Sequence, residues 1–463
     1  MSLDDLLNLS LLLNDTGTQA IKKIYSLFDQ RTYATILGFY ISKIKFDSTL
    51  GKHILLSYSK LKKTKHYNAT IKQLKSDATK GNISNIKILS MLYHTGFVFN
   101  RTNKDKAMKW LYLGIALENR TCETMLACIL LKQDEPTAIK LFQSAAKKNH
   151  KGAIVNLAQI YQSESQRNYP ESFRLLSLPE VKNSSDAQRM LAVMYMEGLH
   201  VDRDEKKAFG LYKSSAELGN SYGQYYVAMC YKHGHGTPIN IAESLRWLRV
   251  SAEDGNHRAQ NDLGGHYKKS ADYPEAFKWF NLSAPHGNKA AMMNLGICYF
   301  NGYGVKADPI KAKELFQKSF DKGYLRAESF LGMMHFFGHG CKKDYGKALE
   351  IFSSAAERKC SRGMEGLGTI YYFGHGVKQD FKEAAKWFLA AFESNNFCGY
   401  TPYILGMMHL HGHGLMKDEP QALKMFSIAH SMGEKSAEQY LVVAQPGEKI
   451  ENTSAKINLI EDS

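Results

Sequence analysis

Proline and long apolar runs are both scarce in this sequence. It has 10 prolines in 463 residues, so helices can continue with few interruptions. No run approaches the roughly 18 to 20 apolar residues that a membrane-spanning helix needs. Asp4 and Asp5 stand where a secretory signal would carry positive charge, so residues 6–13 are predicted to form an amphipathic helix. These absences favour a mostly helical, cytoplasmic protein, with non-classical secretion as an effector left open as the alternative.

The seven cysteines show no C-x-x-C motif and no regular pairing. Cys230 and Cys298 occupy the same position in two copies of the repeat described below, and neither has a second cysteine in its own copy. We therefore interpret the cysteines as small buried hydrophobic residues rather than as disulfide partners.

Motifs typical of catalytic and cofactor sites are also missing. The sequence has no Walker A motif, no G-x-S-x-G and no H-E-x-x-H. Its G-x-G turns link two expected helices rather than a strand and a helix, so they are not a dinucleotide-binding fingerprint. We expect neither an enzyme nor a bound cofactor. A catalytic site assembled from distant residues is the alternative, and the repeats described next disfavour it.

One phrase instead returns along most of the chain. The pattern Leu-Gly-x-x-Tyr/His-x-x-Gly-x-Gly begins at Leu295, Leu331 and Leu367, with a period of 36 residues. A fixed period of this size is typical of a solenoid of stacked helical hairpins, and about ten hairpins are expected between residues 82 and 434. Their anchor residues are Leu89, Leu126, Leu157, Leu191, Val227, Leu263, Leu295, Leu331, Leu367 and Leu405.

Each copy predicts two helices. The first carries small residues four positions before and one position after its anchor, such as Ala327 and Gly332, so one face can approach a neighbouring helix closely. The second follows the glycine turn and carries an alanine and then an aromatic residue, such as Ala348 and Phe352, on one buried stripe. An acidic residue such as Asp344 is expected to cap its first turn.

This phrase resembles the Sel1-like repeat, a relative of the tetratricopeptide repeat. The resemblance is strong over residues 185–434 and weaker over 82–184. It implies an all-α fold, a right-handed α-solenoid of stacked Sel1-like helical hairpins. Residues 1–81 would form a helical N-terminal cap, and residues 435–463 the end of a C-terminal helix and a disordered tail. Altered local geometry is expected where copies lack the double-glycine turn, at the anchors Leu126, Leu157 and Leu263.

Positive charge and histidine are the remaining compositional signals. The 60 basic and 45 acidic residues give a net charge of +15, with part of the excess in the run 59–66. Such a run is more often a solvated face, and no nucleic-acid-binding motif lies beside it, so nucleic acid is a disfavoured partner. Histidines recur in the glycine turns of different copies. Equivalent turns of stacked hairpins lie roughly 10 Å apart, too far for one metal ion to bridge, so no metal site is expected.

The resemblance also implies a partner-binding groove. In tetratricopeptide repeats the first helix lines the groove with positions five and two before its anchor and two and five after it. Among these positions, Ile297 and Met333 are expected to pack against the next repeat. The predicted partner-binding residues are Arg258, Asn261, Lys268, Met293, Phe300, Arg326, Ser329, Phe336, Arg362, Glu365, Thr369, Tyr372, Tyr400, Tyr403, Met407 and Leu410.

The leading hypothesis is a protein-interaction scaffold or adaptor that holds a partner segment in this groove. Three of its positions are arginines and most of the others are aromatic or apolar, so the expected partner is an acidic and apolar peptide segment. Two alternatives follow from the resemblance: a regulatory subunit of a membrane-associated enzyme complex, and a microbial or viral effector that acts on host proteins. The sequence names no individual partner.

Overall fold

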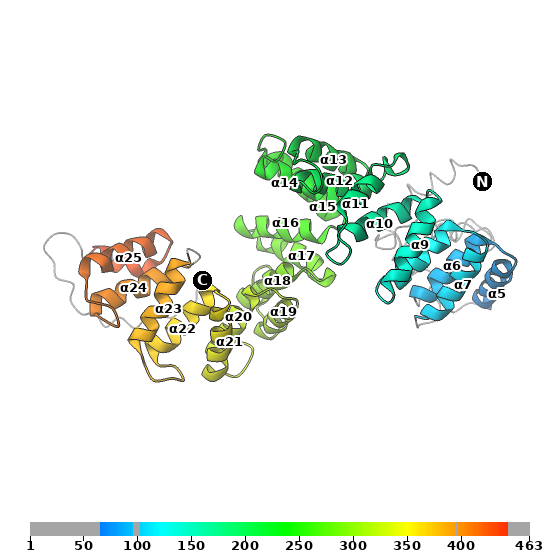
Figure 1. Cartoon of the computed structure of the whole chain (residues 1–463). Coiled ribbons are helices and arrows are strands. Elements are labelled where there is room, and N and C mark those ends of the chain that lie inside the picture. Colours follow the sequence, from blue (N-terminus) through cyan, green and yellow to red (C-terminus); the bar gives the residue numbers. More distant parts are fainter. Residues whose placement is uncertain (1–64, 96–101, 395–396, 443–463) are drawn as a thin grey trace. The chain divides into compact units, whose positions relative to one another are not determined.

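The computed structural model describes residues 65–95, 102–394 and 397–442 (Figure 1). These residues form helices and turns, with no strand among them. The predicted all-α fold is therefore confirmed. Residues 1–64 of the predicted cap and residues 443–463 of the predicted tail lie outside the described part of the chain.

The chain divides into two compact units. The first extends to Gly223 and includes His235–Thr237, and the second contains Gln224–Gly234 and the residues from Pro238 onward. The helices of the first unit are α5 (Lys65–Thr79), α6 (Ile83–Thr95), α7 (Lys104–Ala116), α8 (Arg120–Leu130), α9 (Glu135–Lys147), α10 (Lys151–Gln162), α11 (Tyr169–Leu176), the 3-10 helix η1 (Pro179–Val181), α12 (Ser185–Glu197) and α13 (Glu205–Glu217).

The second unit contains most of α14 (Ser221–His233) and the helices that follow it. These are α15 (Ile241–Glu253), α16 (His257–Lys269), α17 (Tyr273–Ser283), η2 (Ala284–His286), α18 (Lys289–Asn301), α19 (Pro309–Asp321), α20 (Arg326–Phe337), α21 (Tyr345–Glu357), α22 (Ser361–Phe373), α23 (Phe381–Glu393), α24 (Tyr400–His411), α25 (Glu419–Ser431), η3 (Lys435–Ala437) and α26 (Glu438–Val442).

Successive helices pair into hairpins, whose first and second members we call helix A and helix B. In the first unit α6 packs on α7, α8 on α9, α10 on α11 and α12 on α13. The hairpins anchored at Leu126 and Leu157 form although they lack the double-glycine turn. In the second unit the pairs are α14 with α15, α16 with α17, α18 with α19, α20 with α21, α22 with α23, and α24 with α25.

A buried phenylalanine on helix B packs against a glycine on helix A of the same hairpin. Phe352, for example, lies against Gly332, and a methyl group added to that glycine would come within 2.5 Å of the ring. The glycine after the anchor leucine and the aromatic residue of helix B, which both belong to the repeat phrase, therefore contact each other. The second unit has five such pairs: Phe280 with Gly264, Phe316 with Gly296, Phe352 with Gly332, Phe388 with Gly368, and Phe426 with Gly406.

The Gly-x-Gly turn joins one hairpin to the preceding one. Gly412 ends α24 in the left-handed conformation, with φ of 70°. Gly414 has φ of 72° and lies against the backbone of Phe381, so close that an added methyl group would be 2.0 Å from its carbonyl oxygen. The residue between them, His413, stacks on the Phe381 ring at a centroid distance of 4.3 Å. His375 stacks on Tyr345 in the same way, at 4.9 Å. The turn histidines are therefore contacts between hairpins.

These stacked histidines make stability depend on pH. Burial lowers the pKa of His375 and that of His413, and the nearby Lys343 and His411 charges add to the two effects. The Tyr372 hydroxyl also approaches His413 Nδ1, at 3.4 Å. Below the unfolded-state pKa of about 6.5, the unfolded chain binds more protons than the folded one. His375 and His413 therefore contribute stability above about pH 6.5, and this contribution is lost as the pH falls toward their folded-state pKa values.

We expect the melting temperature of the wild-type chain to fall between about pH 7.5 and about pH 5.5. The double variant His375→Phe/His413→Phe should lose less stability over this range, because phenylalanine keeps the stacking and removes the titration. His430 is exposed on α25, so His430→Phe is the matched control and should follow the wild type. An unchanged pH slope in the double variant would contradict a role for the two stacked imidazoles.

Candidate partner-binding surface

All of the predicted partner-binding residues lie on A helices of the second unit, from α16 to α24. Three of them are exposed: Arg258, Arg326 and Arg362. Four are half-buried: Asn261, Lys268, Phe300 and Thr369. The others are buried: Met293, Ser329, Phe336, Glu365, Tyr372, Tyr400, Tyr403, Met407 and Leu410. The accessible part of this surface is therefore mainly cationic and polar.

The buried rings of Phe336 and Tyr372 are covered by helix B of their own hairpin and by the turn histidine of the next hairpin. The Phe336 ring meets the rings of Tyr345 and His375 edge-on, at 5.2 and 5.3 Å. Tyr372 meets Phe381 at 5.3 Å in the same way. The turn histidine of each following hairpin thus closes over the aromatic position near the end of helix A. The Phe300 ring is half-buried, and its centroid lies 5.3 Å from the centroid of the His339 ring.

Glu365 ties two hairpins together. Its carboxylate is buried and accepts hydrogen bonds from the Thr401 hydroxyl at 2.6 Å and from the Cys398 backbone amide at 3.1 Å. Both donors belong to the start of the next hairpin. The Thr369 hydroxyl donates to the Glu365 carbonyl at 2.8 Å, within α22. The Glu365 carboxylate is thus already bound within the fold.

A chain of polar side chains crosses three A helices beside these residues. The Tyr225 hydroxyl on α14 donates to Asp262 on α16 at 3.1 Å, and Asn261 donates to the same carboxylate at 3.0 Å. Asn294 on α18 donates to Asn261 at 3.1 Å. Burial, reinforced by the Asp262 charge, raises the pKa of Tyr225. The predicted partner-binding residues did not include Tyr225, Asp262 or Asn294. Their signal in the sequence is a polar residue one or two positions before the anchor.

Three cations of the predicted surface lie on A helices that are not adjacent in the chain. Lys268 lies near the end of α16, whereas Arg326 and Arg362 lie at the starts of α20 and α22. Burial lowers the pKa of Lys268, and the positive charges of Arg362 and Arg326 lower it further. We call Lys268, Arg326 and Arg362 the basic cluster.

No described carboxylate forms an ion pair with any residue of the basic cluster. The Arg362 guanidinium lies 5.1 Å from the centroid of the half-buried Phe330 ring, a cation–π contact. The charge of Arg258 contributes, after burial, to the lowered pKa of its neighbour His257.

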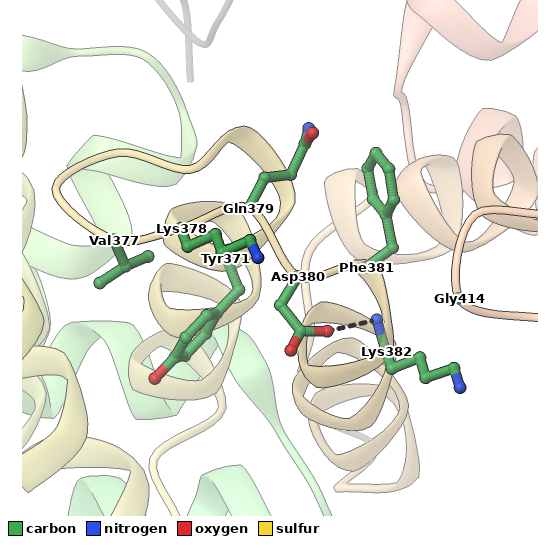
Figure 2. A pocket seen from close by; sticks show the side chains of 8 residues that line it. All are labelled: Tyr371, Val377, Lys378, Gln379, Asp380, Phe381, Lys382 and Gly414. Carbon is green, nitrogen blue, oxygen red and sulfur yellow. Dashed lines mark hydrogen bonds between the residues drawn. The ribbon is translucent and has the colours of Figure 1, made fainter.

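A hollow of about 630 Å³ lies elsewhere on the second unit (Figure 2). The turn from α22 to α23 and Gly414 form its walls. Figure 2 shows the Asp380 carboxylate turned toward the start of α23, where it accepts hydrogen bonds from the amides of Lys382 and Glu383, both at 3.0 Å. Gln379 donates to the Tyr372 carbonyl at 2.8 Å. Much of the polar lining is therefore bound within the turn. The lining residues are Tyr371, Val377, Lys378, Gln379, Asp380, Phe381, Lys382 and Gly414.

The described residues lack two further kinds of feature. No group of three or more histidine, cysteine, aspartate or glutamate side chains among them is placed to hold a metal ion. None of the helices in the same part of the chain combines the length and the apolar character that crossing a membrane requires.

Known proteins share this fold and its repeat. A protective antigen present in uropathogenic Escherichia coli strains, whose crystal structure displays an SLR fold, superposes with a TM-score of 0.55 at 24% identity, over 82% of this chain and 83% of its own. The Sel1-repeat-containing protein YjcO of Escherichia coli (strain K12) is 30% identical over 147 residues. Chitin synthase regulatory factor 2 of Schizosaccharomyces pombe is 25% identical over 203 residues, 40% of each chain. The match to YjcO covers 28% of this chain and 64% of that relative.

The sequence profile of the Sel1 repeat matches more than half of the chain. The matched residues are 88–119, 129–150, 185–220, 221–256, 257–288, 289–324, 325–360, 361–396 and 403–434. They leave out residues 151–184, where α10 and α11 nevertheless form a hairpin. The α-solenoid and the resemblance inferred from the repeat phrase are confirmed: the chain belongs to the Sel1 repeat family.

Proposed function

We propose that this protein is a non-catalytic scaffold or adaptor that holds a segment of a protein partner on the A helices α16 to α22. The observation that carries the proposal is the basic cluster. Its cations come from three separate helices, its two arginines are exposed, and none of the three forms an ion pair with a described carboxylate. Such an arrangement is electrostatically unfavourable in the isolated chain, and binding of a negatively charged partner relieves it.

Half-buried apolar rings lie on the same helices. Phe330 on α20 stacks on Phe316 at 4.9 Å and faces the Arg362 guanidinium, and Phe300 on α18 keeps a half-buried ring. Interfaces combine such apolar side chains with arginine at the positions that contribute most of the binding energy. The surface therefore offers charge and apolar contacts to one partner segment.

Site-specific photo-crosslinking tests this assignment. A benzophenone amino acid at Thr369, which is half-buried on α22, should crosslink to a partner in extract of cells that naturally contain the protein. The same amino acid at Lys318, which is exposed on helix B of another hairpin (α19), is the matched control and should not. Crosslinks from Lys318 and none from Thr369 would place the partner on the B helices and refute the proposal.

A regulatory subunit of a membrane-associated enzyme is a second candidate. It is supported by the similarity to chitin synthase regulatory factor 2, which extends over 40% of this chain. In this case the protein should sediment with membranes and release at high salt, because the described helices offer no membrane-spanning segment. Recovery in the soluble fraction alone would count against this candidate.

A further inference from the structure

Four hairpins of the second unit dock on the preceding hairpin through the second glycine of the Gly-x-Gly turn. This glycine lies against the first residue of the preceding helix B, so close that an added methyl group would come within 2.8 Å of it. Only glycine allows such an approach. The four contacts are Gly304 with Tyr273, Gly340 with Pro309, Gly376 with Tyr345, and Gly414 with Phe381.

The hairpin of α16 and α17 lacks this contact with its predecessor. Its turn is residues 270–272 and contains no glycine, whereas residues 302–308 join α18 to α19. The residue that a longer turn would cover is Ile241, the first of α15. Ile241 is 55% exposed and Ile239 is 65% exposed, whereas the corresponding residues of the four docked joints are half-buried. The start of α15 is therefore open to solvent.

Hydrophobic and polar contacts join the same two hairpins through the second half of α15. Ala252 on α15 and Ala259 on α16 are buried in one cluster. Gln260 on α16 donates a hydrogen bond to the Ala252 carbonyl at 3.0 Å, and Arg249 on α15 donates one to the Tyr267 hydroxyl at 2.8 Å. The joint is thus closed at one end of α15 and open at the other.

We propose that this joint is a hinge of the second unit, at which the hairpin of α16 and α17 opens and closes against the start of α15. In a repeat protein each interface between neighbouring repeats contributes its own share of the stability. The joint lacks a contact that four others share, so it opens at a lower cost in free energy. The packed end around Ala252 and Ala259 is the pivot. A few residues at the ends of helices are enough to absorb such a motion.

The hinge lies beside the A-helix surface. The hydrogen bond from Tyr225 to Asp262 crosses the same joint, between α14 and α16. Asp262 also accepts a hydrogen bond from Asn261, a predicted partner-binding residue. Opening of the joint therefore shifts groups that contact this residue. A partner that binds one arrangement of these groups more tightly than the other favours the corresponding hinge state.

Pulsed electron spin resonance between two nitroxide labels measures the motion. One label replaces Arg246 on α15 and the other Lys278 on α17, both on unnatural amino acids so that the native cysteines stay unlabelled. The matched pair replaces Glu350 on α21 and Lys386 on α23, across a docked joint. All four residues are exposed, and each is the sixth of its helix. We expect a broader distance distribution between positions 246 and 278 than between positions 350 and 386.

A grafted turn supplies the missing contact. Ser270 and Ala271 are replaced by a copy of residues 302–307, which contain the double-glycine turn of the next hairpin. The distribution between positions 246 and 278 should then narrow to the width of the matched pair. A control graft carries alanine in place of the glycine copied from Gly304. Its methyl group prevents the close approach to α15, so the distribution should stay broad. Circular dichroism melts check that both grafts fold.

Two results would overturn the inference. The first is an equal width for the two label pairs in the chain with its natural turn, a comparison that needs no graft to fold. The second is equal narrowing by the glycine graft and the alanine graft. The length of the turn, rather than the docking of its glycine on α15, would then control the motion.

Discussion

Replacing Phe352 by alanine is expected to lower the free energy of unfolding by about 3 to 5 kcal/mol, the usual cost of removing a large buried aromatic side chain. Phe352 is 3% exposed. Its ring lies between Gly332 on α20 and Gly366 on α22, and a methyl group added to either glycine would come within 2.5 Å of it. The side chain therefore holds together one hairpin and the start of the next. Its loss leaves a cavity at the junction.

Urea denaturation followed by circular dichroism measures this effect, and hydrogen exchange localises it. In a repeat protein, stability is approximately a sum over repeats and their interfaces. We therefore expect faster exchange in α20, α21 and α22 before other parts of the second unit change. Tyr112→Ala removes an aromatic side chain that is 54% exposed on α7 and should change stability by no more than about 0.5 kcal/mol. Similar losses in the two variants would show that Phe352 does not join the hairpins.

The fold could be predicted because the repeat phrase describes contacts inside one copy. Gly332 and Phe352 belong to the same copy and touch each other. The pattern therefore contains both partners, and its return every 36 residues marks each hairpin. The capping aspartate follows the same logic, because Asp344 accepts a hydrogen bond at 2.9 Å from the amide of Lys347, three residues later. Local chemistry of this kind is visible in one sequence.

The accessibility of the binding surface could not be predicted in the same way. Phe336 matches a groove position of the tetratricopeptide repeat, but it is buried because His375, in the turn of the next copy, lies against it. The sequence pattern within one copy does not indicate that a side chain of the next copy, His375, buries Phe336. The sequence likewise suggested a row of arginines that included Arg258. In the structure the charges of Arg326 and Arg362, after burial, lower the pKa of Lys268. Which cations meet depends on the rotation between successive hairpins, and this rotation has no signature in the repeat phrase.

The sharpest test of the helix packing compares two neighbouring glycines on α16. Gly264 faces Phe280, and an added methyl group would lie 2.8 Å from the ring. Gly265 is next to it, and a methyl group there would meet no atom within 4 Å beyond its chain neighbours and the adjoining backbone of α16. Gly264→Leu should therefore overpack the contact with α17 and destabilise the protein by roughly 1 to 3 kcal/mol or more. Gly265→Leu should be neutral or stabilise it by up to about 1 kcal/mol, because leucine favours helix more than glycine does.

Both variants introduce the same side chain into the same helix, so intrinsic helix propensity favours them equally. A difference between their unfolding midpoints in urea then reports the Phe280 contact alone. Phe280 is fully buried, so its ring has no solvent-filled space into which it could move. Equal midpoints for Gly264→Leu and Gly265→Leu would mean that α16 and α17 separate without cost. The glycine after the anchor leucine would then have another cause than the close approach of helix A and helix B. This conclusion would apply to this hairpin and to the four others with the same Phe–Gly contact.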